Sequence, residues 1–62
     1  MANFYYVTVL FANGTKRNYH GLMYYLGGQK APGYDKLEKM KQILYRMFQN
    51  GIVKDVCIDY ES

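Results

Sequence analysis

The chain has 62 residues, half of them hydrophobic, with eight lysines and arginines against five acids. That length allows one domain with a small core, and the net charge of +3 is too small to indicate a dedicated nucleic-acid binder by itself. The single cysteine, Cys57, excludes an intramolecular disulfide and fits a reducing compartment. No signal-peptide pattern is visible, and no apolar run approaches the roughly 20 residues that span a bilayer. We therefore expect a cytoplasmic protein that does not associate with membranes.

The first predicted strand, residues 4–11, reads Phe-Tyr-Tyr-Val-Thr-Val-Leu-Phe, an aromatic and β-branched composition that fits a pleated sheet. Both faces of this strand are apolar, whereas a surface strand normally alternates apolar with polar residues. One explanation is that a partner or a second copy covers the second face. The other is that this face is exposed, which tyrosine tolerates because its hydroxyl stays in water. The covered face is favoured.

The pair Asn13-Gly14 follows and favours a tight type I′ hairpin turn. The chain then returns through a second strand that runs to Leu26. Two registers are open. With a two-residue loop, the return strand extends the aromatic face of the first strand with Arg17, Tyr19, Met23 and Tyr25. With a three-residue loop and Gly14 in a bulge, every pairing shifts and the return strand swaps its faces.

Glycines mark two further places in this half of the chain. Gly21, inside the second strand, predicts either a bulge or a spot where a tyrosine ring lies over bare backbone. Residues 27–33 combine three glycines, a lysine and the only proline, so a phosphate-binding loop must be considered. Their spacing matches neither of the common phosphate-loop patterns. A plain connector is favoured.

A helix follows this connector. Asp35 and Glu38 have the spacing of a capping box, so we expect the helix to begin at Asp35. Apolar residues then recur at helical spacing and predict one buried stripe, made of Leu37, Met40, Leu44, Met47 and Phe48, with Ile43 at its margin. Asn50-Gly51 ends the helix, because glycine suits the left-handed position just past a helix end.

The last strand covers residues 52–60 and alternates more regularly. One face carries Ile52, Val56, Ile58 and Tyr60, and the other carries Val53, Asp55, Cys57 and Asp59. The sequence therefore predicts one α+β domain over residues 1–62, with the order β-β-α-β. Its three-stranded antiparallel or mixed sheet has the strand order 2-1-3, with one helix packed on one face. The opposite face stays uncovered, and an exposed face so rich in tyrosine is typical of an interaction site.

Catalytic and metal-binding groups are sparse. One histidine and one cysteine cannot form a zinc site of the usual kind, and a buried structural cysteine is favoured over a nucleophile. Asp55 and Asp59 share a face but stand about 13 Å apart at the strand rise, too far for a paired acid and base. We expect no enzyme and no cofactor.

Two function classes remain. The first is a protein-binding module that docks its tyrosine-rich sheet face on a larger protein, with Tyr6, Arg17, Tyr19, Tyr25 and Lys16 as its contact residues. The second is a small basic binder of RNA or single strands, in which sheet aromatics stack on bases while Lys16, Arg17 and Lys30 hold phosphates. The absence of the aromatic RNA-binding pattern and the low net charge disfavour the second class. A homodimer interface on the apolar face is the third alternative.

Small chains of this kind are often encoded by phages and mobile elements, where many act as stoichiometric inhibitors of host systems. On that general ground, and not on any motif, we expect a non-enzymatic inhibitor or regulator of a larger protein. A host nuclease or another host complex would be its partner, as for an anti-defence or anti-CRISPR protein.

Overall fold

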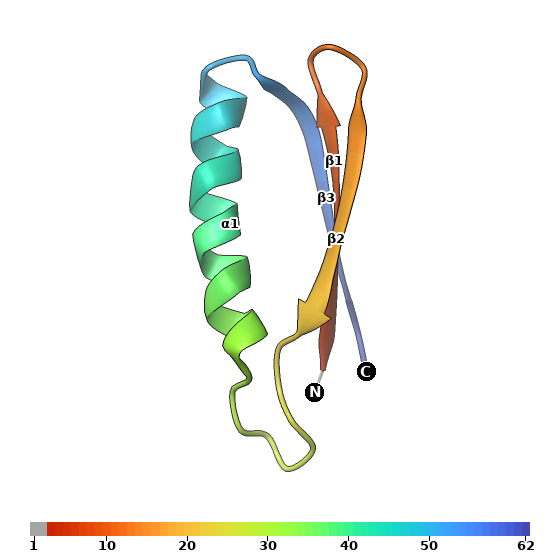
Figure 1. Cartoon of the computed structure of the whole chain (residues 1–62), viewed down its shortest axis with the longest axis vertical. Helices are drawn as coiled ribbons and strands as arrows, with labels where there is room; N and C mark the ends of the chain where they lie inside the picture. The colour runs from red at the N-terminus through yellow and green to blue at the C-terminus, as the bar shows by residue number, and fades with distance from the viewer. Residues whose placement is uncertain (1–2) are drawn as a thin grey trace.

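A computed structural model describes residues 3–62. It contains strands β1 (Phe4–Phe11) and β2 (Lys16–Leu22), helix α1 (Pro32–Gln49) and strand β3 (Val53–Glu61). The strands form an open antiparallel sheet in the order β2-β1-β3, and α1 lies along one side of it (Figure 1). The predicted α+β fold, its β-β-α-β order and its 2-1-3 sheet are confirmed.

The turn between β1 and β2 is the longer of the two expected loops. The Phe11 amide donates to the Thr15 carbonyl at 2.8 Å, and the Gly14 amide donates to the Phe11 carbonyl at 3.0 Å. Gly14 has a φ of 88°, and among residues 3–62 only glycines take a positive φ. A type I′ turn would need a positive φ at Asn13 as well, so that prediction is wrong. The loop has three residues, with Gly14 in the left-handed position.

This register determines which residues share a face of the sheet. Tyr6 lies opposite His20, whereas Tyr19 lies opposite Val7 and Arg17 lies opposite Val9. Directly opposed residues project to the same side of an antiparallel pair. Arg17 and Tyr19 therefore lie on the helix side of the sheet and do not extend the face that carries Tyr6.

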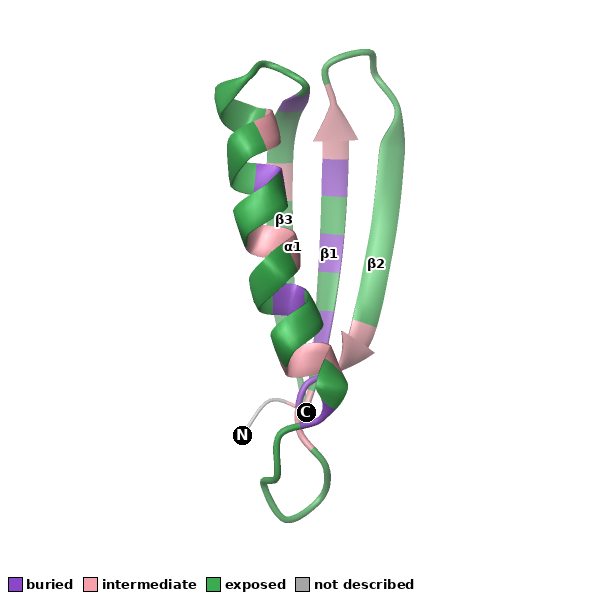
Figure 2. Cartoon of the chain, turned by 60° about the vertical axis from the view of Figure 1, so that its left-hand side comes forward, coloured by how far each residue is buried: buried purple, intermediate pink, exposed green. Residues whose placement is uncertain are grey.

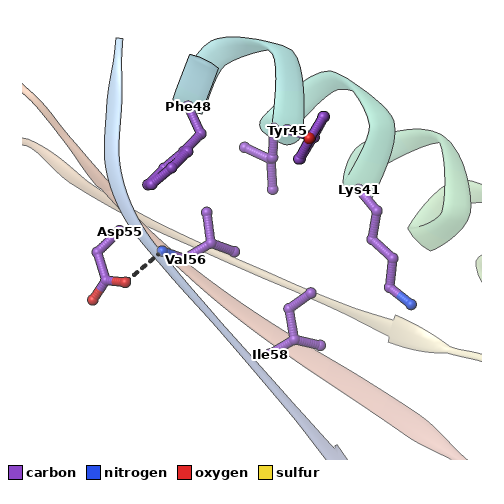
Figure 3. A pocket seen from close by; sticks show the side chains of 7 residues that line it. Lys41, Tyr45, Phe48, Asp55, Val56 and Ile58 are labelled. Atoms are coloured by element: carbon purple, nitrogen blue, oxygen red, sulfur yellow. Dashed lines mark hydrogen bonds between the residues drawn. The ribbon is translucent and has the colours of Figure 1, made fainter. Parts of the chain in front are cut away.

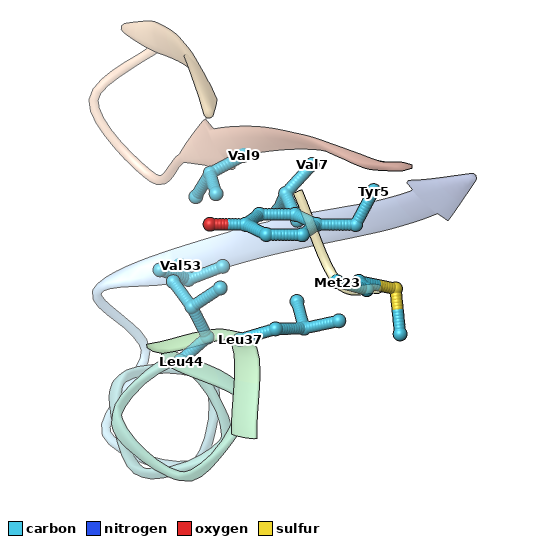
Figure 4. Close-up of a cluster of buried hydrophobic side chains, with 7 residues drawn as sticks. All are labelled: Tyr5, Val7, Val9, Met23, Leu37, Leu44 and Val53. Atoms are coloured by element: carbon cyan, nitrogen blue, oxygen red, sulfur yellow. The ribbon is translucent and has the colours of Figure 1, made fainter. Parts of the chain in front are cut away.

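The core lies between α1 and the helix side of the sheet. Alternate residues of β1 are buried, with Tyr5, Val7 and Val9 exposed by only 4%, 1% and 0%, and the alternation is visible along the strand in Figure 2. The rest of the buried cluster comes from the other elements and consists of Met23, Leu37, Leu44 and Val53 (Figure 4). Burial of these side chains supplies most of the driving force for folding.

Helix α1 begins three residues before the predicted start. Ala31 is its N-cap and Pro32 its first residue, a position where the missing proline amide loses no helical hydrogen bond. In the part of the chain that the structure describes, no side chain caps this end, so the predicted capping box of Asp35 and Glu38 is wrong.

The predicted apolar stripe of α1 is buried only in part. Leu37 and Leu44 are buried, and Met40 and Met47 are half-buried against the core. Phe48 is exposed and lies on the flank of the helix beside β3, where it lines a groove with Val56.

Two glycines lie where another group approaches the backbone closely. Gly21 lies opposite Tyr5, and a Cβ added there would be 2.6 Å from the Tyr5 hydroxyl oxygen. This confirms that a tyrosine ring lies over bare backbone at Gly21. A Cβ at Gly33 would collide with the Leu22 carbonyl, where the start of α1 meets the end of β2.

Strand β3 contains an irregularity that the alternation pattern did not predict. The register shifts between Leu10, which pairs with Asp55, and Phe11, which pairs with Val53. Lys54 is left without a partner in this pairing, as expected for a β-bulge. Val53 therefore lies in the core, and its predicted place on the polar face with Asp55 is wrong.

The predicted second strand is too long. β2 ends at Leu22, and beyond it Tyr24 forms an isolated antiparallel bridge with Lys30. This bridge closes a loop that carries Tyr25 and Leu26 at the end of the sheet. The start of β1, the end of β3 and this loop lie at the same end of the molecule (Figure 1).

Candidate interaction surfaces

The sheet face opposite α1 is not covered by any part of residues 3–62, and we call it the open face. The pairing of the strands places twelve residues on it: Phe4, Tyr6, Thr8, Leu10, Lys16, Asn18, His20, Leu22, Asp55, Cys57, Asp59 and Glu61. Phe4 and Tyr6, on its central strand, are each 41% exposed. The open face thus has a mainly apolar central strand flanked by the mainly polar residues of two edge strands.

Neighbouring side chains on the open face contact one another. The Tyr6 and His20 rings lie 6.2 Å apart between centroids, and the Thr8 hydroxyl donates to the Asn18 side-chain oxygen at 3.1 Å. On β3, the Cys57 thiol lies 3.9 Å from an Asp59 carboxylate oxygen. Cys57 is exposed on this face, so the predicted buried structural cysteine is wrong. The first two contacts connect β1 to β2 and leave Tyr6 exposed.

Charge is distributed unevenly across the open face. β3 contributes the acids Asp55, Asp59 and Glu61, whereas β2 contributes Lys16 and His20 and no acid. A row of carboxylates beside the aromatic centre repels phosphates, since like charges at close range are destabilising. This arrangement disfavours nucleic acid on the open face.

The structure divides the five predicted contact residues among three places. Tyr6 and Lys16 lie on the open face, while Arg17 and Tyr19 lie on the helix side of β2. Tyr25 lies in the loop beyond β2. The five therefore do not form one aromatic surface.

Tyr25 nevertheless borders the open face. A hollow of about 550 Å³ at the end of the sheet is lined by Phe4 and Leu22, which belong to the open face, and by Asn3, Tyr24, Tyr25 and Leu26. Leu26 is 93% exposed. The apolar surface thus continues from the sheet centre onto the loop, and Phe4, Leu22 and Leu26 are contact candidates that sequence reasoning missed. Phe4 and Tyr6 are two residues apart on one strand and therefore share a face, which was a sequence signal for Phe4.

On the helix side, α1 leaves a groove along each edge of the sheet. The β2 groove, about 460 Å³, is lined by Tyr5, Phe11, Tyr19, Lys36, Lys39, Met40, Ile43, Leu44 and Met47. The β3 groove, about 240 Å³, lies between Tyr45 and Phe48 of α1 and Val56 and Ile58 of β3 (Figure 3). One helix is narrower than three strands, so both edges remain accessible.

The two grooves differ in how their charges are compensated. In the β3 groove the Lys41 ammonium lies 3.4 Å from a Glu38 carboxylate oxygen, and the Tyr60 side chain, followed by Glu38, raises the pKa of Lys41. In the β2 groove the two lysines, Lys36 and Lys39, have no acidic residue among the described residues that line it. The β2 groove therefore presents uncompensated positive charge around an apolar floor.

Residues 3–62 contain no group of three or more His, Cys, Asp or Glu side chains arranged to hold a metal ion. Nor does any helix within this range have the length and apolarity needed to cross a bilayer. No protein-family model matches the chain, and neither a curated protein nor a solved structure resembles it.

Proposed function

We propose that this chain is a non-catalytic protein-binding module that docks its open face on a larger protein. The observation that carries this proposal is the exposure of Phe4 and Tyr6 on a strand whose alternate residues are fully buried. Aromatic side chains at the centre of an exposed sheet offer a large apolar contact area with polar edges, the composition typical of binding hot spots.

The shape of the molecule supports the proposal. Its radius of gyration is 12.6 Å, against about 10.5 Å for a typical domain of this length. Its accessible surface of 4687 Å² exceeds the roughly 4,200 Å² expected for a monomer of this mass. The excess surface is what a two-layer fold exposes when one side of its sheet has no cover.

The size of the open face favours a larger protein over a second copy. Three strands of eight residues span about 27 Å by 14 Å, which gives a footprint of about 400 Å². Two copies stacked through this face alone would bury about 800 Å² in total, a value typical of crystal contacts. A larger partner can reach past the sheet onto the hollow at Tyr25 and Leu26, which brings the buried area toward that of a stable interface.

The narrower hypotheses stay predictions that rest on size and composition. They are that the partner is a host nuclease or other host complex, that binding inhibits it, that the protein is of phage or mobile-element type, and that it acts in the cytoplasm. The competing function, nucleic-acid binding through the same face, is opposed by the acids of β3 and would weaken steeply as salt rises.

Photo-crosslinking in the cells that naturally contain this protein tests the proposal. One protein carries the photoreactive residue p-benzoylphenylalanine in place of Tyr6, and the matched control carries it in place of Tyr45, an exposed aromatic on α1. We expect a discrete heavier protein adduct from position 6 and not from position 45. An adduct with nucleic acid, an adduct of twice the chain mass, or equal adducts from both positions would overturn the proposal.

A further inference from the structure

The outer edge of β2 and the β2 groove beside it form a second surface, separate from the open face. We propose that this surface binds an extended acidic segment of a protein partner, which adds to the sheet as a fourth strand alongside β2. The inference rests on the proposed function for the partner being a protein, but it concerns different residues.

The backbone of β2 has a free hydrogen-bonding edge. The Phe11 amide donates to the Thr15 carbonyl at 2.8 Å, and the Met23 amide donates to the Asn3 carbonyl at 2.6 Å. The backbone N–H and C=O groups of the odd-numbered residues of β2 therefore point toward β1. The even-numbered residues of β2 therefore direct their N–H and C=O groups outward. Those of Lys16, Asn18 and His20 are open, whereas the start of α1 lies against the Leu22 carbonyl. Such a row of donors and acceptors is a template for an added strand.

The opposite edge of the sheet is protected. On β3 the outward-facing amide of Val56 donates to the Asp55 carboxylate at 2.9 Å (Figure 3), which occupies one donor that an added strand would need. No bond of this kind is found for the outward amides of β2 in the described part of the chain, so the two edges are not equivalent.

The β2 groove provides contacts for the side chains of the added strand. Every second residue of that strand would lie on the helix side, above a floor that includes Tyr19, Met40 and Ile43. Ile43 is 58% exposed, an apolar side chain that such a strand would cover. The groove volume of about 460 Å³ lies within the range of pockets that bind ligands.

Charge complementarity identifies the segment as acidic. Lys36 and Lys39 line the groove, and Lys16 and Arg17 stand on β2 itself, which carries no acid. A phosphate chain would satisfy the lysines but only accepts hydrogen bonds, so it would leave the outward carbonyls of β2 and the apolar floor without partners. A second copy is disfavoured because β2 pairing with β2 brings like charges together, and the acidic strand β3 has a protected edge.

Fluorescence anisotropy with the purified chain tests this inference. The probe is a labelled ten-residue peptide in which glutamate alternates with valine and isoleucine, and the control probe has lysine in place of glutamate. We expect saturable binding of the acidic probe that weakens as salt rises, and no binding of the lysine probe. Equal binding of both, or none of either, would overturn the inference.

Two matched pairs of variants locate the site. Asn18→Pro removes an outward amide without removing a bond to β1, whereas Asn18→Ala keeps that amide; we expect binding about fivefold weaker for Asn18→Pro alone. Lys39→Glu should weaken binding more than Lys54→Glu, which makes the same charge change on β3. Equal effects within each pair would contradict the assignment.

Two further measurements cover the case in which Asn18→Pro does not fold and the case in which a second copy of the chain binds the edge. If Asn18→Pro does not fold, a probe with alternate N-methylated residues removes the donors on the peptide side and should bind no more tightly than the lysine probe. A solution mass that rises with concentration for the unmodified chain, and not for Asn18→Pro, would assign the edge to a second copy and overturn the inference.

The two proposals can fail separately. A protein crosslinked at position 6 without binding of the acidic peptide would contradict only the added strand at β2. Binding of the acidic peptide without a protein crosslinked at position 6 would contradict only the open-face proposal.

Discussion

The two faces of β1 are nearly equal in composition and opposite in environment. Tyr5, Val7 and Val9 are enclosed by α1, while Phe4 and Tyr6, one residue away along the strand, are exposed. The difference shows that an apolar strand face need not be covered by the chain that carries it. One helix can cover only one of the two faces.

Under the proposed function, the covered face provides stability and the open face provides binding. Substitutions beneath α1 should therefore destabilise the fold, and substitutions on the open face should leave the fold intact and abolish partner contact. The predictions below test this division, beginning with the largest expected effect.

Leu37→Ala should cause the largest loss of stability. Leu37 is buried in the core beneath α1, and removing a leucine side chain from such a site costs about 2–5 kcal/mol. A domain of this length has only about 3–9 kcal/mol of stability in total. Urea denaturation followed by circular dichroism should show a largely or fully unfolded variant. A change below about 1 kcal/mol would mean that α1 does not hold the covered face.

Gly21→Ala should destabilise by about 1–3 kcal/mol, because the new methyl group overlaps the Tyr5 ring. The double variant Tyr5→Leu with Gly21→Ala sharpens the test. If the ring is the cause, Gly21→Ala should cost less in the Tyr5→Leu background than in the native chain. Equal costs in both backgrounds would point to backbone strain instead of the ring.

Tyr6→Ser should change the unfolding free energy by about 1 kcal/mol at most, since Tyr6 is half-exposed on the open face. Loss of an aromatic anchor at an interface costs about 2 kcal/mol or more in binding free energy. We therefore expect the variant to fold and to lose its partner in a competition assay against the unmodified chain. Tyr45→Ser, at an exposed position of α1 beside the β3 groove and away from the open face, is the control and should change neither quantity appreciably.

The smallest effect concerns Lys41. Tyr60, and then Glu38, raise its pKa in the folded state above the ordinary value of 10.5. Its contribution to stability is therefore fully present below that value and is lost as the pH rises through the folded-state pKa. Lys41→Gln should show a slightly smaller fall in melting temperature between neutral and strongly alkaline pH than the native chain does. Lys54→Gln, which has no such neighbours in the described residues, should match the native chain.

Much of the fold could be predicted from the sequence, because local signals and global topology agree in it. The composition of residues 4–11, the helical spacing from Leu37 to Met47 and the glycines around them determine the elements and their order. The ring over Gly21 was also predictable, since a glycine inside a strand invites a large neighbour.

The sequence could not predict which residues share a face of the sheet, because one residue more or less in a loop or a bulge reverses that assignment. Asn13-Gly14 is compatible with both a two-residue and a three-residue loop, and the choice moves Arg17 and Tyr19 from one side of the sheet to the other. The bulge at Lys54 likewise moves Val53 from the predicted polar face to the helix side of the sheet. An alternating sequence pattern predicts that a strand has two different faces. It does not predict the position of a bulge, beyond which the residues exchange faces.

The reactivity of Cys57 tests most directly whether the open face is free. Cys57 is the only cysteine of the chain, and it lies exposed on the open face. We predict that a thiol-specific reagent labels the folded protein rapidly, at the same rate in dilute and concentrated solution, and that the labelling slows when the larger partner is bound. Slow labelling of the isolated chain, or labelling that slows as the protein is concentrated, would show that the face is already covered and would contradict the account.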